Sequence, residues 1–387
     1  MTTTINNEHK KLNVPNLRFP EFQGEWKRTI FKNVITLQRG SSPRPIIEYV
    51  TTSDDGVNWI KIGDMPHFGR IVTSTEEKIT KEGAKKSRQV NKGDLILSNS
   101  MSYGLPYIMG IDGYIHDGWF VLKNFENTFD KDYLCNLLIS SAIQNQYKRL
   151  AAGGVVQNIS SDLVNSVSVS IPTMMEQKKI SSLLNLIDER IATQNKIIED
   201  LKKLKSAISH ILFSSKGAIH LSEIATVVMG QSPSSIAYND QGLGMPLVQG
   251  NLDISNGKTT PRLYTAEFNQ TTEKGNIILT VRAPVGEVAK ATQKVCLGRG
   301  VCAIIPHEEN MSDFIYQYLT FYKFMWRRYE QGSTFTSING SDVRNIFCPK
   351  VRNVSILTLL DIKINIEERV VKQYQSQKQY MLYQMFI

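Results

Sequence analysis

Two long stretches of the chain carry apolar residues at alternating steps of four and three, uninterrupted by glycine or proline. The first covers residues 175–212, and the second runs from Val354 to the end. This spacing is typical of a coiled-coil seam and predicts two long helices, whose apolar stripes must be buried. We therefore expect the helices to pack against each other, antiparallel. The predicted seam includes Ile180, Leu184, Ile187, Ile191, Ile198, Leu201, Leu360, Ile364, Val371 and Tyr374.

Each predicted helix follows a segment of short apolar runs and turns, and the two segments repeat one pattern. The features are, in order, an apolar run closing on Gly, Ser and Pro, a strand ending in a turn, a turn opening a strand, a helix, and a glycine-containing polar loop. Turn chemistry common to α+β domains is the alternative explanation, but recurrence in the same order favours duplication. The matched segments are 35–43 with 225–233, 59–64 with 246–251, 92–98 with 274–280, 132–141 with 313–322, and 153–160 with 332–339.

The pattern predicts an α+β fold with two similar domains, each a short-strand sheet plus helices. Two long antiparallel coiled-coil helices separate them, with a pseudo-twofold relation within one chain. A DNA turn repeats every ~34–36 Å, so such a spacer could set two reading heads in successive major grooves. A hairpin that serves only for dimerisation explains the pattern equally well. The predicted boundaries are 1–174 for the first domain, 175–214 for the central helix, 215–352 for the second domain and 353–387 for the C-terminal helix.

The net charge of the chain indicates which classes of partner are favoured. The 387 residues include 45 Lys and Arg against 36 Asp and Glu, a formal net charge of +9 with a pI of about 9.2. This balance favours DNA, RNA or an acidic protein surface, although an ordinary basic enzyme shares it. No apolar run approaches the ~20 residues of a membrane span, and the N-terminus lacks a signal-peptide core, which predicts a soluble, cytoplasmic protein without a membrane partner. The four cysteines form no CxxC pair and are predicted to be reduced, buried thiols.

Motifs of catalysis are missing from the sequence. It contains no HExxH, no GxxxxGK[ST], no GxGxxG after a predicted strand, no GxSxG and no Asn/Asp-Pro-Pro-Tyr. The six histidines show no metal-ligand spacing. We therefore predict no catalytic residue, metal site or cofactor in this chain. An active site built from unrecognised residues is the alternative.

Basic, amide and hydroxyl residues gather beside glycines in the matched loops. Arginine suits phosphates or guanine edges, Asn and Gln can pair with adenine, and Ser and Thr suit phosphate. For any single residue a solvated turn is the more ordinary explanation, but recurrence in both repeats favours a DNA surface. The candidates in the first repeat are Arg39, Ser41, Arg44, Lys61, Asn99, Ser100, Tyr103, Gly153, Gly154, Gln157 and Asn158. Those in the second are Gln231, Ser232, Asn251, Arg282, Gly332, Ser333, Thr334, Thr336 and Asn339.

Short motifs along the whole chain carry a family resemblance when they are taken together with the duplication and the two heptad helices. They are residues 14–22 followed by Trp26, Lys92-Gly-Asp94, Gly153-Gly154, and Ile171-Pro172 followed by Glu176-Gln177-Lys178-Lys179-Ile180 and Leu186-Ile-Asp188. In this order they resemble the DNA-specificity (S) subunit of type I restriction-modification enzymes.

The resemblance implies a non-catalytic subunit that reads a bipartite double-stranded DNA target from the major groove, one domain per half-site. The helices would fix the gap between the halves and dock two modification (methyltransferase) subunits, with Glu176 and Gln177 joining the seam residues as docking candidates. Those subunits would bring S-adenosylmethionine and methylate adenine. Restriction subunits would bring ATP- and Mg-dependent cleavage, and this chain would hold no cofactor.

The second junction departs from the family pattern. Residues 349–357 lack the Glu-Gln-Lys-Lys-Ile signature, and Glu367 and Lys378 lie on the seam of the C-terminal helix, so the first methyltransferase contact is better supported than the second. Two other classes of protein stay open. A protein-binding coiled-coil scaffold would form salt-insensitive complexes and retain no DNA, and an unrecognised enzyme would turn over substrate alone.

Overall fold

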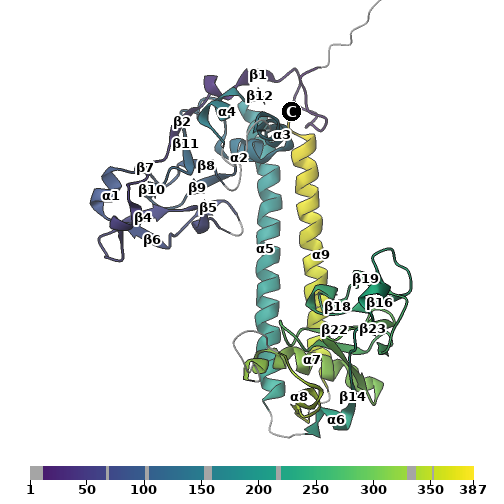
Figure 1. Cartoon of the computed structure of the whole chain (residues 1–387). Coiled ribbons are helices and arrows are strands. Elements are labelled where there is room, and N and C mark those ends of the chain that lie inside the picture. The colour runs from purple at the N-terminus through teal and green to yellow at the C-terminus, as the bar shows by residue number, and fades with distance from the viewer. Residues whose placement is uncertain are drawn as a thin grey trace, which may run out of the picture. The chain divides into compact units, whose positions relative to one another are not determined.

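The computed structural model forms two compact units, each containing one repeat and part of both long helices (Figure 1). Unit 1 comprises Met1–Lys196 and Arg369–Ile387, and unit 2 comprises Ile197–Glu368. The long helices predicted from the heptad spacing are present as α5 (Met174–Phe213) and α9 (Ser355–Gln384). The structure describes residues 12–66, 69–100, 104–151, 159–214, 219–328, 337–350 and 353–387.

The described residues of unit 1 form two five-stranded sheets and one two-stranded pair. The sheets have the orders β2-β11-β8-β9-β5 and β3-β6-β4-β10-β7, and β1 pairs with β12. The strands are β1 (Lys27–Ile30), β2 (Thr36–Arg39), β3 (Val50–Thr51), β4 (Val57–Ile60), β5 (Ile71–Val72), β6 (Glu77–Ile79), β7 (Arg88–Val90), β8 (Leu95–Ser98), β9 (Pro106–Met109), β10 (Gly113–Ile115), β11 (Trp119–Lys123) and β12 (Ser168–Ile171). The shorter helices are α1 (Lys81–Lys85), α2 (Lys131–Ile139), α3 (Ser141–Ala151) and α4 (Ser161–Ser166).

In unit 2, the part of the chain that the structure describes forms a six-stranded sheet, a five-stranded sheet and one two-stranded pair. The sheets have the orders β14-β24-β21-β22-β18-β17 and β15-β19-β16-β23-β20, and β13 pairs with β25. The strands are β13 (Ile219–His220), β14 (Ala225–Met229), β15 (Tyr238–Asn239), β16 (Met245–Val248), β17 (Ile254–Ser255), β18 (Lys258–Thr259), β19 (Leu263–Thr265), β20 (Thr271–Thr272), β21 (Ile277–Thr280), β22 (Val288–Lys290), β23 (Val295–Leu297), β24 (Val301–Pro306) and β25 (Phe347–Cys348). The shorter helices are α6 (Leu221–Ile224), α7 (Ser312–Tyr322) and α8 (Gly340–Arg344).

The two units share one strand order. The larger sheet of unit 2 has the order β14-β24-β21-β22-β18, which corresponds strand for strand to the order β2-β11-β8-β9-β5 in unit 1. Strand β17 is an additional edge strand of unit 2. Strand directions agree as well, because the parallel pairs β5–β9 and β4–β10 have the parallel counterparts β18–β22 and β16–β23. The duplication predicted from the sequence is therefore confirmed, as is the α+β fold class.

One of the sequence alignments is wrong by one residue. Ile60 of β4 lies opposite Ile115 of β10, and at the equivalent place Val248 of β16 lies opposite Leu297 of β23. Ile60 therefore corresponds to Val248, whereas the sequence pattern set it against Leu247. The register is fixed by hydrogen bonding to the neighbouring strand, and the glycine that ends both motifs does not report it.

Turns and apolar runs explain how the central strands form. Strands β8 and β21 are buried along their whole length, as their nearly unbroken apolar sequences predict. Each is preceded by a turn with a left-handed glycine, Gly93 at φ 93° and Gly275 at φ 90°, where a side chain would be strained. These strands place their C-terminal ends beside the loops that hold the candidate DNA residues.

The long helices contact each other within each unit. In unit 1, Ile180 and Leu184 of α5 share a core cluster with Leu382 and Met385 of α9. In unit 2, Lys205 of α5 bonds Asp361 of α9 at 2.5 Å and Lys202 bonds Glu368 at 2.8 Å. As the residue number rises along α5, the residue number of its partner on α9 falls. The two helices therefore pack antiparallel, as predicted.

Candidate nucleic-acid interface

In unit 1, three chain segments meet at the turn between β10 and β11, formed by residues 116–118. The loop after β2 approaches so closely that a Cβ on Gly40 would lie 1.9 Å from the His116 carbonyl oxygen. Only glycine fits there, which explains the glycine of the Gly-Ser-Ser-Pro motif. The end of β8 contributes Asn99, whose backbone N–H donates to the Gly118 carbonyl at 2.9 Å. Candidates distant in sequence therefore surround one turn.

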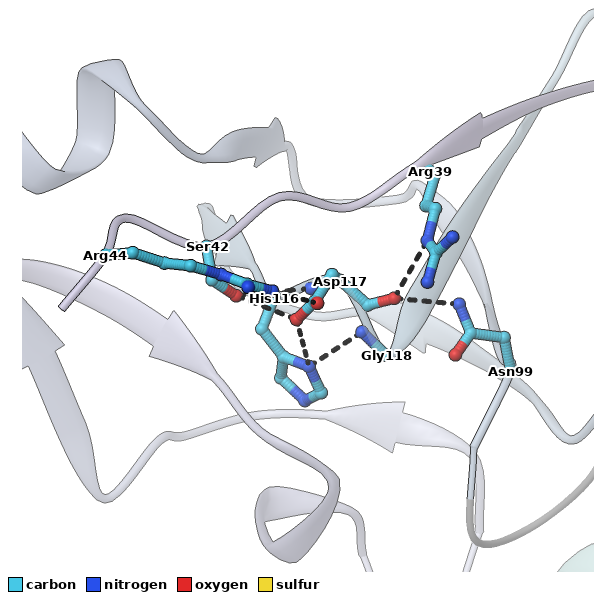
Figure 2. Close-up of polar contacts among 7 residues, drawn as sticks. All are labelled: Arg39, Ser42, Arg44, Asn99, His116, Asp117 and Gly118. Carbon is cyan, nitrogen blue, oxygen red and sulfur yellow. Dashed lines mark hydrogen bonds and ion pairs between the residues drawn. The ribbon is translucent and has the colours of Figure 1, made fainter. Parts of the chain in front are cut away.

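Asp117 is the centre of these contacts (Figure 2). Its carboxylate accepts a hydrogen bond from the Ser42 hydroxyl at 2.9 Å and pairs with the Arg44 guanidinium at 3.2 Å. Its carbonyl oxygen accepts from Arg39 Nε at 3.3 Å and from Asn99 Nδ2 at 2.9 Å. Burial acts to raise the pKa of Asp117, but the Ser42 hydroxyl, the backbone and nearby positive charge together lower it. The turn presents a carboxylate at neutral pH.

His116 supports the turn from beneath as a neutral ring. It packs against Trp59 and Trp119, with ring centroids 6.2 Å away in each case. Its Nδ1 accepts the backbone N–H of Gly118 at 2.8 Å. Burial lowers the pKa of His116 and outweighs the opposing effect of Asp117. The 3.8 Å approach of Nδ1 to the Asp117 carboxylate is therefore not an ion pair at neutral pH.

The equivalent turn of unit 2, residues 298–300 between β23 and β24, has an arginine where unit 1 has an aspartate. The backbone N–H of Arg299 donates to Ser232 Oγ at 3.0 Å, as that of Asp117 donates to Ser42 Oγ at 3.4 Å. These matching bonds show that Arg299 occupies the position of Asp117. Sequence analysis missed both residues because neither lies in a repeated motif.

A hollow of about 510 Å³ opens beside Arg299. Its described lining includes Ser232, Gln249 and the exposed side chains of Arg282 and Arg299, and it contains no acidic residue. Neither arginine forms an ion pair with any described residue. In unit 1, by contrast, Arg44 pairs with Asp117, and Lys61 pairs with Glu77 at 2.7 Å. The two surfaces share a backbone frame but differ in charge.

The other predicted DNA candidates have mixed surroundings. Asn99 is only 3% exposed, so its amide positions the turn. Asn339 caps α8, its Oδ1 accepting two backbone N–H groups. Gln231 is exposed, whereas Ser41, Ser100 and Asn251 are half-buried. Those outside the described residues are Tyr103, Gly153, Gly154, Gln157, Asn158, Gly332, Ser333, Thr334 and Thr336.

Glu176 and Gln177, two docking candidates, are buried inside unit 1, each 1% exposed. The Glu176 carboxylate accepts hydrogen bonds from Arg18 Nε at 2.8 Å, from Arg18 Nη2 at 2.9 Å and from the Trp26 indole at 3.2 Å. The Gln177 amide bonds three backbone groups at 2.8–3.1 Å. Both side chains tie the start of α5 to its own domain, so they are unavailable to a partner.

Six of the ten seam candidates are buried and four are half-buried, whereas other apolar residues of the long helices are exposed. Those that are buried are Ile180, Leu184, Ile187, Ile198, Ile364 and Val371, and those half-buried are Ile191, Leu201, Leu360 and Tyr374. Beside the seam in unit 2, large apolar side chains are 47–77% exposed, namely Leu204, Ile211, Leu359, Ile362 and Ile366. The heptad pattern missed these positions because it assigns them to solvent.

Metal-ligand clusters and membrane-spanning helices are absent from the described ranges. These ranges contain no group of three or more His, Cys, Asp or Glu side chains arranged to hold a metal ion. None of their helices is long and apolar enough for a membrane span. All four cysteines are buried and free, as predicted, and burial raises the pKa of Cys302 and of Cys348 to about 12.

The chain matches one protein family twice. The family of the type I restriction modification DNA specificity domain matches residues 24–203 and again residues 217–373. The specificity subunit assigned to the type I restriction enzyme MjaX of Methanocaldococcus jannaschii is 27% identical over 380 residues, which covers 88% of this chain and 86% of that protein.

Solved structures show the same fold. A chain from a study of complex assembly and conformational transition in the type I R-M system has a TM-score of 0.63 at 21% identity, covering 92% of this chain and 96% of that one. The S subunit of the type I restriction-modification system of M. genitalium has a TM-score of 0.60 at 18% identity, covering 97% and 99%. The two family matches span most of the sequence, and each contains one of the duplicated sheet systems. The chain therefore belongs to the type I restriction-modification DNA-specificity family, as a specificity subunit and not a catalytic one.

Proposed function

We propose that this chain reads a bipartite DNA target, with one domain for each half-site. The observation that carries the proposal is the pair of turns at Asp117 and Arg299, which have one backbone frame and different side chains. Two such surfaces in one chain suit two half-sites of different sequence. Their guanidinium, amide and hydroxyl groups are those that contact phosphates and base edges, and the net charge of +9 favours a polyanion.

The long helices, in this proposal, set the unspecific gap and dock two methyltransferase subunits. Exposed apolar side chains beside the seam support a protein contact, because large exposed apolar patches mark interaction surfaces. On α9 in unit 2 the residues Leu359, Ile362 and Ile366 follow helical spacing and are 64%, 52% and 47% exposed. The buried seam would hold the helices together while these neighbours face the partner.

The proposal leaves the chemistry to the partner subunits. S-adenosylmethionine would be bound by the methyltransferase subunits, and ATP and Mg by restriction subunits where those are present. This chain would bind no cofactor and would act in the cytoplasm, on DNA. Its own contribution would be target selection and spacing.

A domain exchange tests the function. Residues 1–174 are replaced by those of another family member, and the chain is co-expressed with its methyltransferase subunit. Sequencing of methylated adenines should show one half of the target changed and the other half and the gap kept. The reciprocal exchange of residues 215–352 is the matched control and should change only the other half. Changes in both halves, or in neither, would contradict the proposal.

A further inference from the structure

One position differs in the sign of its charge between two otherwise equivalent turns. The backbone N–H groups of Asn99 and Val281 donate to the carbonyls of Gly118 and Gly300, both at 2.9 Å. On the other side of the turns, the N–H groups of Ser41 and Gln231 donate to Ile115 and Leu297. Because bonds on both sides match, the central residues, Asp117 and Arg299, occupy one position of the fold.

The backbone beneath Arg299 is tightly held. A Cβ on Gly300 would lie 2.1 Å from the Gln249 carbonyl oxygen, and a Cβ on Gly298 would lie 2.8 Å from Gln249 Cγ. A Cβ on Gly230 would lie 2.1 Å from the Gly298 carbonyl oxygen. The turn is therefore packed against two neighbouring segments, and Arg299 carries its only side chain. The held backbone fixes the point from which the Arg299 side chain starts and directs it from the turn.

Comparison of the turns favours a base contact over a phosphate contact. A phosphate contact shared by both units is excluded, because Asp117 is a carboxylate and would repel a phosphate, whereas base contacts can differ between two half-sites. A position that can carry either a positive or a negative side chain is suited to reading bases. Guanine offers the acceptors O6 and N7 to a cationic donor, whereas cytosine offers an amino donor to a carboxylate. Arg299 and Arg282 line one hollow, and within the described part of the chain neither has a carboxylate partner.

We infer that Arg299 selects a guanine in the half-site read by unit 2, through the paired acceptors O6 and N7. The inference rests on the proposed DNA-reading function. Arg282, in the same hollow, would support the site by binding the neighbouring backbone or base. At the equivalent position, Asp117 would disfavour guanine and accept from a base amino group instead.

The test uses the full chain with its methyltransferase subunit and compares wild type, Arg299→Gln and Arg299→Lys. Methylated adenines are sequenced, and DNA affinity is measured against salt for the target and for variants at each base pair. Arg299→Gln should lose guanine discrimination roughly ten- to hundredfold at a single base pair of one half-site. Arg299→Lys should restore it only in part, because an ammonium can donate to O6 and N7 but lacks the planar fork of the guanidinium. Lys274→Gln, an exposed charge before β21, is the matched control and should keep the base preference.

Other outcomes would overturn the inference. If Arg299→Gln weakens all sequences equally, lowers the salt slope by about one and is rescued by Arg299→Lys, the residue contacts phosphate. A wild-type target without guanine in that half-site would also end it, with the proposed function intact. If the wild-type complex methylates without any sequence preference, the proposed function itself fails.

Discussion

The two units attach their domains to the long helices by different chemistry. In unit 1, the start of α5 is held by a buried polar cluster, in which the Glu176 carboxylate accepts from both Arg18 and Trp26. In unit 2, the start of α9 is held by the apolar side chains of Val354 and Leu357, which are 3% and 0% exposed. The same junction between domain and long helix can therefore be stabilised by an ionic cluster or by apolar packing. Substitutions at the two junctions should destabilise the chain in different ways. Removing one member of the ionic cluster leaves a charge without its partner, whereas removing a methyl group from the apolar contact leaves a cavity.

A second pair of contacts differs in degree. In unit 1, Lys378 donates to both Asp188 oxygens at 2.5 and 2.7 Å, and Arg70 pairs with the same carboxylate at 3.1 Å. In unit 2, Lys205 bonds Asp361 at 2.5 Å, and the Gln317 amide is the other donor, at 2.7 Å. The unit 1 carboxylate thus has two cationic partners, and the unit 2 carboxylate has one. The second carboxylate should depend more on its lysine.

The largest effect is expected from Glu176→Ala. The substitution removes the acceptor of the buried Trp26 indole N–H and of the half-buried Arg18 guanidinium, which keeps its bonds to the carbonyls of Gln23 and Gly24. The free energy of unfolding should therefore fall by about 2–4 kcal/mol. Urea unfolding followed by tryptophan fluorescence measures it, because Trp26 touches the altered site.

Two variants sharpen that prediction. The neighbouring Met175 is 76% exposed, so Met175→Ala should change the stability by no more than about 0.5 kcal/mol. Replacing both partners, Glu176→Leu with Arg18→Met, should recover much of the loss because no charge is stranded. If Glu176→Ala behaves like Met175→Ala, the ionic junction does not stabilise unit 1.

A smaller effect should separate the two lysines. Lys205→Met leaves Asp361 with only the Gln317 amide and should cost about 1–2 kcal/mol, whereas Lys378→Met leaves Asp188 paired with Arg70 and should cost about half as much or less. Hydrogen exchange in each unit measures both losses, each variant serving as the control for the other. Equal losses of stability in the two variants would show that Arg70 does not compensate for Lys378 as a partner of Asp188.

Features with local causes could be predicted from the sequence. The long helices follow from apolar spacing alone, and the turns at Gly93 and Gly275 follow from a glycine before an apolar run. The duplicated order of these features was enough to predict two similar domains. It could not supply the register of β4 and β16, because that depends on pairing with strands far along the chain.

The candidate site was predicted only in part for the same reason. Arg39 and Arg44 lie in a repeated motif, but the residue that organises them, Asp117, reaches them through the pairing of β10 and β11 with distant strands. Glu176 shows the opposite failure, because a charged residue in a signature sequence suggests exposure, whereas it is 1% exposed. Neither the contacts of a turn nor the burial of a charge is encoded locally.

The smallest expected effect concerns pH. Burial lowers the pKa of Lys378 in the folded chain, although the bonds to Asp188 oppose this, and the ordinary value of 10.5 applies after unfolding. Between these two values the unfolded chain binds more protons than the folded chain, so the contribution of Lys378 to stability should rise with pH. Lys378→Met removes this contribution, so wild type should gain stability over the variant as the pH rises through the range just below 10.5. Urea unfolding across that range measures the difference, with Lys205→Met in unit 2 as the comparison. Wild type losing stability relative to Lys378→Met as the pH rises would mean that the pair with Asp188 outweighs burial, so that unit 1, like unit 2, relies on its lysine.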